Sequence, residues 1–214
     1  MNRKNLLVPI CVLCASVGAL VGSFANAGAD SKSAGTPEMK LPKGWTPEDM
    51  QACMAAGTPG EQHAFLAKSI GTWKGTSTHV MAPDADPMVS DCTSVVSSSM
   101  DGRFTQVDFS TEMPGMGMMK GMGLHGYDNT AKKFVTVWVS NMCTSMMTGT
   151  GAMASDGSSM TWTYSGNCPI SKKPMTMREV QSFNSANSMT LEMYCPDPKT
   201  GKEYKAMTVE LTRG

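Results

Sequence analysis

The spacing of apolar residues changes once along the chain, at Trp73. Before this residue the apolar positions follow a period near 3.6 and predict two short α-helices within residues 45–70. Thr46-Pro47 and Thr58-Pro59 are typical starts of helices, and Gly71 ends the second one. After Trp73, Thr, Ser, Val and Met dominate and the period becomes two, which is typical of β-strands.

Turn signals recur about every 10–13 residues after Trp73. Asp101-Gly102 is the sequence of a type I′ hairpin, and further turns fall at 128–129, 156–157, 184–187 and 197–201. About ten strands joined by short turns, with no helix between them, form an antiparallel up-and-down meander. Such a long sheet usually closes and so removes its edges. We therefore predict an all-β fold, a single β-barrel over residues 71–214 preceded by the helix pair.

Several strands show which residues share a face. One strand has Val135, Val137 and Val139 on one side and Thr136, Trp138 and Ser140 on the other. Later strands group Met189, Leu191, Met193 and Cys195, and then Met207, Val209 and Leu211. The alternation leaves open which face of residues 135–140 points into the barrel.

The first 27 residues have the features of a signal peptide. A cationic start at residues 2–4 precedes an uncharged, mostly apolar run at 6–24, and Ala25-Asn26-Ala27 provides the small residues that signal peptidase needs. A membrane anchor is the alternative, but glycines dilute the apolar run. We expect an exported protein, periplasmic or secreted, that has no membrane span after cleavage and begins with a flexible tether at 28–44.

Charge excludes one class of partner. The chain has 18 basic and 18 acidic residues, and loss of Arg3 and Lys4 with the signal peptide leaves 16 basic residues. No basic stretch is present that would bind nucleic acid or an anionic membrane surface.

The order of a meander predicts which loops share an end of the barrel. The turns at 101–102, 128–129, 156–157 and 184–187 fall at one end, together with Trp73. The loops at 82–88, 114–120, 141–145, 167–174 and 196–202 fall at the other end, which we expect to be the mouth.

Five cysteines follow the signal peptide, namely Cys53, Cys92, Cys143, Cys168 and Cys195. An oxidising compartment favours disulfides, and none of the five forms a C-x-x-C motif. We predict a Cys143–Cys168 disulfide across one hairpin at the mouth, with Cys195 as the first competitor.

Gly71-Thr72-Trp73 resembles the G-x-W signature of the calycins, which are lipocalin-like ligand-binding barrels. In calycins the tryptophan closes one end of the barrel and stacks beneath a basic side chain of the last strand. The resemblance assigns that role to Arg213, with a cation–π contact of about 1–2 kcal/mol.

Residues 63–214 resemble the bacterial family called domain of unknown function 1579. The similar blocks are "HAFLAKSIGTWKG", "MDGRFTQVDF", "LHGYDNTAKKFVTVWVS", "MTMREV" and "CPDPKTGKEYKAMTVELTR". The resemblance implies a calycin-like barrel and no assigned activity. Family members tend to have W-x-D where this chain has Trp138-Val139-Ser140, so no role for that carboxylate is implied.

Methionine is abundant, with 22 residues in the chain. Five of them lie close together in the sequence: Met113, Met116, Met118, Met119 and Met122. Thioethers suit Cu(I), so a copper site at this cluster is one hypothesis. Methionine is also an adaptable filler of cores and of pliable binding surfaces, which we consider the better explanation. A haem ligand at His79 is a further alternative.

The sequence contains no G-x-S-x-G, H-E-x-x-H or comparable catalytic motif, so we expect a non-enzymatic protein. The leading hypothesis is a barrel that binds a small apolar molecule through a methionine-rich rim and needs no cofactor. Candidate ligand contacts are Phe109, Trp138, Trp162 and Met193. The alternatives are the Cu(I)-binding protein and a filled barrel that makes protein–protein contacts in the cell envelope.

Overall fold

A computed structural model describes residues 41–214 of the chain. The predicted signal peptide and all but the last four residues of the predicted tether lie outside the described residues. Two helices come first, α1 (Pro47–Gly57) and α2 (Glu61–Ala67). They belong to different compact units, because one unit ends at Thr58 and the other, which contains α2 and every strand, begins at Pro59. Within the described part of the chain, no helix has the length and apolarity needed to cross a membrane.

Capping explains where α1 begins. The Thr46 hydroxyl accepts a hydrogen bond from the Asp49 backbone N–H at 3.2 Å, and the Asp49 carboxylate accepts one from the Thr46 N–H at 2.8 Å. Pro47 occupies the first turn, where a missing N–H costs nothing. None of the α1 side chains is buried.

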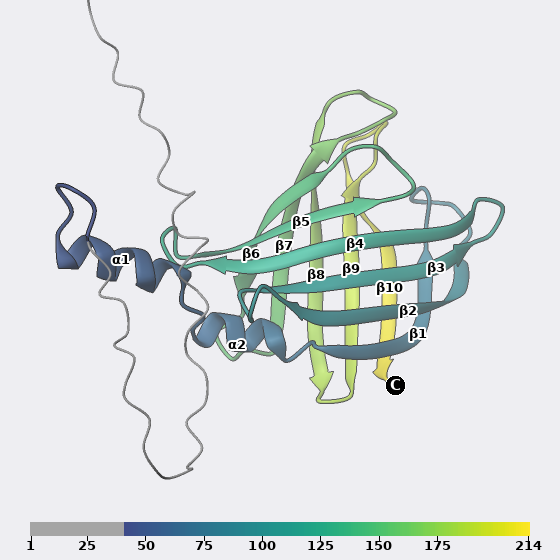
Figure 1. The fold of residues 1–214 in the computed structure, drawn as a ribbon. Helices are drawn as coiled ribbons and strands as arrows, with labels where there is room; N and C mark the ends of the chain where they lie inside the picture. The colour runs from purple at the N-terminus through teal and green to yellow at the C-terminus, as the bar shows by residue number, and fades with distance from the viewer. Residues whose placement is uncertain (1–40) are drawn as a thin grey trace, which may run out of the picture. The chain divides into compact units, whose positions relative to one another are not determined.

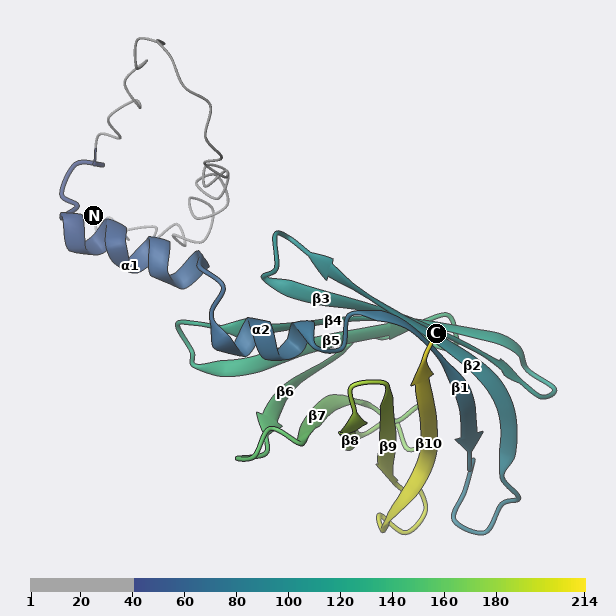
Figure 2. The same cartoon turned by 90° about the horizontal axis from the view of Figure 1, so that it is seen from below.

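Ten strands follow α2 and form a closed antiparallel barrel (Figures 1 and 2). The strands are β1 (Gly71–His79), β2 (Met88–Ser99), β3 (Phe104–Met113), β4 (Gly117–Asp128), β5 (Lys133–Ser140), β6 (Met147–Met153), β7 (Ser159–Asn167), β8 (Pro174–Ser185), β9 (Ser188–Pro196) and β10 (Glu203–Arg213). Each strand pairs with its neighbours in sequence, and β10 pairs with β1. The predicted fold class is confirmed.

Closure of the barrel places Trp73 and Arg213 next to each other. They are partners in the β1–β10 ladder, and the Arg213 guanidinium carbon lies 4.2 Å from the centre of a Trp73 ring. Trp73 is buried, and its indole N–H donates a hydrogen bond to the Ser69 carbonyl at 2.8 Å. The Arg213 guanidinium also donates to the carbonyls of Lys68, at 3.1 Å, and Ile70. These contacts fasten the segment that follows α2 to the last strand.

The helix α2 packs against one end of the barrel, called the closed end below. The Phe65 ring of α2 lies edge-on to Phe134, at 6.3 Å between centres, and to Phe183, at 5.6 Å. Phe134 is near the start of β5 and Phe183 is near the end of β8, so both mark the end that carries the turns at 129–132 and 186–187. The loops at 80–87, 114–116, 141–146, 168–173 and 197–202 lie at the opposite end.

The inner face of β5 carries its larger and more polar side chains. Phe134 and Thr136 are buried, and Trp138 packs against the buried core, whereas Val135 and Val137 are only partly covered. β5 therefore shows the three valines to the outside. Its inner wall is built from the aromatic and hydroxyl residues.

The predicted Cys143–Cys168 disulfide is not present. Both cysteines are free thiols, as are Cys92 and Cys195. The β6–β7 ladder pairs Thr148 with Ser165, two residues out of step with the predicted pairing. β6 also begins only at Met147, so Cys143 lies in the preceding loop rather than on a strand. The prediction was wrong because it placed both cysteines on paired strands, whereas the ladder begins at Thr148–Ser165 and Cys168 lies just beyond the end of β7.

Candidate functional site

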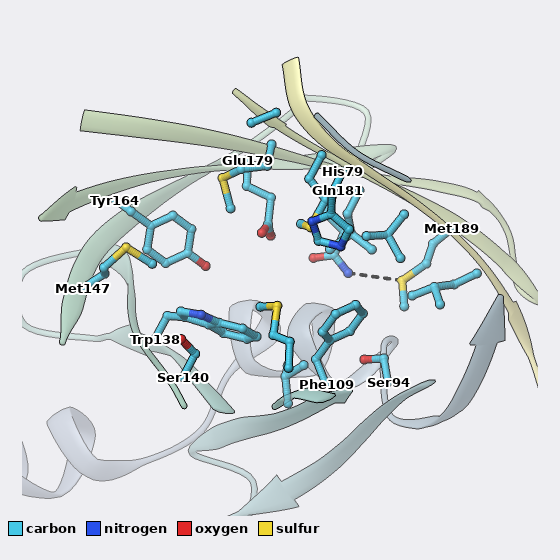
Figure 3. A pocket seen from close by; sticks show the side chains of 18 of the residues that line it. His79, Ser94, Phe109, Trp138, Ser140, Met147, Tyr164, Glu179, Gln181 and Met189 are labelled. Carbon is cyan, nitrogen blue, oxygen red and sulfur yellow. Dashed lines mark hydrogen bonds between the residues drawn. The ribbon is translucent and has the colours of Figure 1, made fainter. Parts of the chain in front are cut away.

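The barrel encloses a cavity of about 380 Å³. All ten strands contribute to its wall, and Figure 3 shows many of the side chains that line it. One lining residue from each strand, in order from β1, is His79, Ser94, Val107, Met119, Trp138, Met147, Tyr164, Glu179, Met189 and Met207. Alternation along each strand produces this arrangement, since every second side chain points inward.

Most of the cavity wall is apolar. Aliphatic side chains such as Leu191, Val209 and Leu211 form one part of it, and Phe109 and Trp138 provide aromatic surface. The lining methionines are Met81, Met119, Met147, Met189, Met193 and Met207. Their unbranched side chains can adjust to the shape of an apolar molecule.

Two glycines of β4 make room for the Trp138 indole. A Cβ atom on Gly121 would lie 2.1 Å from Trp138 Cζ2, and one on Gly123 would lie 3.1 Å from Trp138 Cε3. Gly123 is also the partner of Trp138 in the β4–β5 ladder. The indole therefore lies over bare backbone, and the glycine-rich stretch of β4 sets the width of the cavity beside it.

Glu179 is the acidic side chain of the cavity. It lies on the inner face of β8, only 8% of it is exposed, and its carboxyl group points into the cavity (Figure 3). Within residues 41–214 no group forms a hydrogen bond or ion pair with this carboxyl. Burial raises the pKa of Glu179 to about 7, because the charged form loses its hydration.

Tyr164 lies close enough to Glu179 for the carboxylate charge to change the pKa of its phenol. It is buried on the inner face of β7, and burial followed by the negative charge of Glu179 raises the pKa of its phenol well above the ordinary value. Tyr164 is therefore a neutral hydroxyl at physiological pH. It can donate or accept a hydrogen bond.

Two histidines line the cavity in their neutral forms. Burial lowers the pKa of His125 to about 4 and also lowers the pKa of His79. The His125 ring lies edge-on to Trp162, with 4.5 Å between the ring centres. The Nε2 atom of His79 is buried and has no hydrogen-bond partner among the described residues. A buried polar atom of this kind normally has a partner, so His79 is a candidate contact for a ligand.

The remaining polar side chains complete the wall. Gln181 follows Glu179 on the inner face of β8, and its amide donates to the Met189 sulfur at 3.4 Å. Tyr204 donates a hydrogen bond to the Met81 carbonyl at 3.2 Å, at the end opposite α2. The lining contains no lysine, arginine or aspartate. Of its side chains, Glu179 is the one that ionises near neutral pH.

Three of the four predicted ligand contacts, Phe109, Trp138 and Met193, line the cavity. Trp162 does not line the cavity; it is completely buried on the inner face of β7, where it packs against His125 and Phe134.

Sequence reasoning missed Glu179, Tyr164 and Gln181, which carry the polar chemistry of the cavity. A signal did exist, because Glu179 lies two residues after the apolar Met177 and so shares a face of β8 with it, as a charged residue among apolar ones. This signal becomes readable only when the inner face of the strand is known.

The structure distributes the five clustered methionines over two faces. Met113 is buried and Met119 lines the cavity, whereas Met118 and Met122 on β4 are 47% and 41% exposed on its outer face. Met116 lies in the turn between β3 and β4. The five sulfurs therefore do not converge on one point. Residues 41–214 also contain no group of three or more His, Cys, Asp or Glu side chains placed to bind a metal.

Comparison with known proteins identifies a matching family and solved structures of similar fold. A family model described as "Protein of unknown function (DUF1579)" matches residues 58–213. The crystal structure of Rv2717c from M. tuberculosis is similar at a TM-score of 0.54 and 11% identity, over 73% of this chain and 99% of that one. The S-type phycobiliprotein lyase CPES from Guillardia theta has a TM-score of 0.47 and 11% identity, over 72% of this chain and 92% of that one. At this identity the likeness concerns the fold alone. No curated protein matches the chain.

Proposed function

The chain belongs to the family described as protein of unknown function (DUF1579), and we propose that it is an exported binding protein, not an enzyme, that holds one small, largely apolar molecule inside its calycin-like barrel. The observation that carries this proposal is the cavity of about 380 Å³ with walls from all ten strands. Its volume lies in the range of small-molecule sites, roughly 300–1,000 Å³.

The composition of the cavity wall supports a ligand of mixed character. Apolar side chains cover most of the wall, and a few polar groups, among them Glu179, Tyr164 and His79, come from separate strands. An apolar pocket with few polar groups is the usual form of a site that gains affinity from burial and specificity from hydrogen bonds.

The end opposite α2 is the proposed mouth. Met81, which lies there, belongs to the cavity wall and is 59% exposed, so the wall continues to the surface. Met142 and Met146 in the loop between β5 and β6 are 44% and 64% exposed. These methionines would form a pliable apolar rim through which a ligand enters.

Export is proposed from the N-terminal sequence. The apolar run and Ala25-Asn26-Ala27 are features of a cleaved signal peptide, which would direct the barrel to the periplasm or the medium. The ligand would then be a molecule found in that compartment.

The proposal is tested with the neutral fluorescent probe N-phenyl-1-naphthylamine, titrated into the purified protein. We expect one probe per barrel. Ser94 lies in the wall and is 3% exposed, so Ser94→Phe fills part of the cavity and lowers the affinity at least about tenfold.

Ser97→Phe is the matched control, because Ser97 is exposed on the outer face of the same strand. It should bind the probe as the unaltered protein does. Equal loss in both variants, or no loss in Ser94→Phe, would show that the probe does not bind in the cavity. If only Ser94→Phe loses affinity, native mass spectrometry of protein purified from its own compartment is the next step, and it would identify the natural ligand.

A further inference from the structure

The polar side chains of the cavity wall include a carboxylic acid but no lysine or arginine. The titratable side chains of the wall are Glu179 on β8, His79 on β1, His125 on β4, Tyr164 on β7 and Tyr204 on β10. The histidines have lowered pKa values and the tyrosines raised ones, so these four side chains are neutral at pH 7. The cavity therefore offers one ionisable acid and no cation.

This distribution selects against acidic ligands. A carboxylate in the cavity would be desolvated without a lysine or arginine to pair with, and it would be repelled by the ionised form of Glu179. For a ligand with a positive charge, the interaction with Glu179 is attractive and can offset the loss of hydration. Such a ligand would lose hydration too, but it would gain an ion pair with a carboxyl that has no protein partner among residues 41–214.

The surroundings of the Glu179 carboxyl also suit a cation. Figure 3 shows the carboxyl between Tyr164 and Gln181, with the Trp138 indole on the opposite side of the cavity. The faces of aromatic rings attract cations, most strongly where water is excluded. The Tyr164 hydroxyl and the Gln181 carbonyl oxygen can accept hydrogen bonds from an ammonium group.

We propose that the cavity selects a small hydrophobic amine, which is bound as its ammonium ion by Glu179 with the Trp138 ring on the other side of the charge. This inference rests on the proposed function, and it adds the chemical class of the ligand. The apolar part of the amine would lie against the methionines and aliphatic side chains of the wall.

Binding of such an amine is coupled to the protonation of Glu179. The pKa of Glu179 is about 7 in the free protein, so a fraction of the molecules carries a neutral carboxyl at pH 7. The ammonium ion pairs with the carboxylate, and the proton of a neutral Glu179 leaves to solvent. Affinity for the amine therefore rises with pH, by about tenfold between pH 6 and pH 8.

The test uses three probes of similar size that differ in charge. These are 2-phenylethylamine, 2-phenylethanol and phenylacetate, each titrated into the protein by isothermal calorimetry at pH 8. We expect the amine to bind at least about tenfold more tightly than the alcohol, which corresponds to one charge-assisted hydrogen bond. Phenylacetate should bind more weakly than the alcohol.

Variants show whether Glu179 is responsible. Glu179→Gln keeps the shape and removes the charge, so the amine should lose its advantage over the alcohol and the rise in affinity from pH 6 to pH 8 should disappear. Glu210→Gln removes an equal charge from the outer face of β10, where Glu210 is exposed. This control should leave both the preference and the pH dependence unchanged.

The outcomes separate this inference from the proposed function. If all three probes bind equally well, or if phenylacetate binds best, the amine proposal is wrong and the binding function stands. If Glu210→Gln changes amine binding as much as Glu179→Gln does, the effect is long-range and Glu179 is not the ammonium site. If none of the probes binds, and N-phenyl-1-naphthylamine does not bind either, both proposals are wrong.

Discussion

Glu179 is an acidic residue in a buried and mostly apolar environment. A carboxyl group buried without a partner loses its hydration when ionised, and this free energy is not recovered from the protein. Proteins keep such groups mainly where the group has a function, because a neutral side chain of similar size would make the fold more stable. The stability of the barrel should therefore depend on pH through this residue.

We predict that alkaline pH destabilises the folded protein through Glu179. The pKa is raised from 4.5 to about 7 on folding, so the folded state holds its proton more tightly and stability falls as pH rises through this interval. At pH 8 the loss relative to acid pH approaches about 3 kcal/mol. Glu179→Gln should lack it.

The measurement is urea unfolding at pH 5 and pH 8 for both proteins. The difference in unfolding free energy between Glu179→Gln and the unaltered protein should be larger at pH 8. Burial lowers the pKa of His125 from 6.5 to about 4, so this residue makes the folded protein less stable as pH falls below 6.5. His125 is present in both proteins, so its effect cancels in this comparison. An equal difference at the two pH values would show that Glu179 is hydrated.

At the scale of single elements, the two faces of β4 explain the glycine- and methionine-rich segment. Met119 points into the cavity, Met118 and Met122 point out, and Gly121 and Gly123 accommodate the Trp138 ring. A cluster in the sequence is therefore divided by the alternation of a strand. The abundance of methionine was evident from the sequence, but its division between wall and surface depended on which face turned inward.

We predict that Gly121→Ala reduces ligand binding by moving Trp138. The new Cβ would lie 2.1 Å from the indole, so the ring must shift, and we expect it to move into the cavity. The affinity for N-phenyl-1-naphthylamine should fall about tenfold, because the cavity loses volume. The emission maximum of tryptophan fluorescence should also change.

Gly57→Ala is the control for this substitution. Gly57 ends α1, and its new Cβ would have no other atom within 4 Å. Binding should stay within a factor of about two. Unchanged binding by Gly121→Ala would mean that Trp138 moves away from the cavity instead.

At the scale of the whole molecule, the contact between Trp73 and Arg213 joins the first and last strands of the barrel. Its components are the ring contact at 4.2 Å and hydrogen bonds to the carbonyls of Lys68 and Ile70. These groups are separated by about 140 residues in the sequence, so they meet only when the cylinder closes. The contact therefore reports on closure.

We predict that Arg213→Ala lowers the unfolding free energy by about 2 kcal/mol, because it removes the cation–π contact and leaves two carbonyls without their donor. Arg178→Ala is the control. Arg178 also lies over an aromatic ring, that of Tyr194 at 3.9 Å, but on the exposed outer face, where the loss should stay below about 1 kcal/mol. Urea unfolding measures both, and equal losses would argue against a role in closure.

The sequence by itself determined the elements and their order. Alternation, turn residues and capping signals act between residues close in the chain, so the two helices, the ten strands and the meander could all be predicted from it. The G-x-W signature and the position of Arg213 then indicated that the sheet closes.

Only the tertiary structure decided which residues meet inside. Alternation defines two faces of a strand, but burial depends on partners across the barrel, so Trp138 faces the cavity and the adjacent valines face outward. For the same reason Cys143 and Cys168 stay apart, and Glu179 shares a cavity with Tyr164 although nothing in their sequence spacing relates them. The chemistry of the site arises from packing at a distance along the chain, which local patterns do not record.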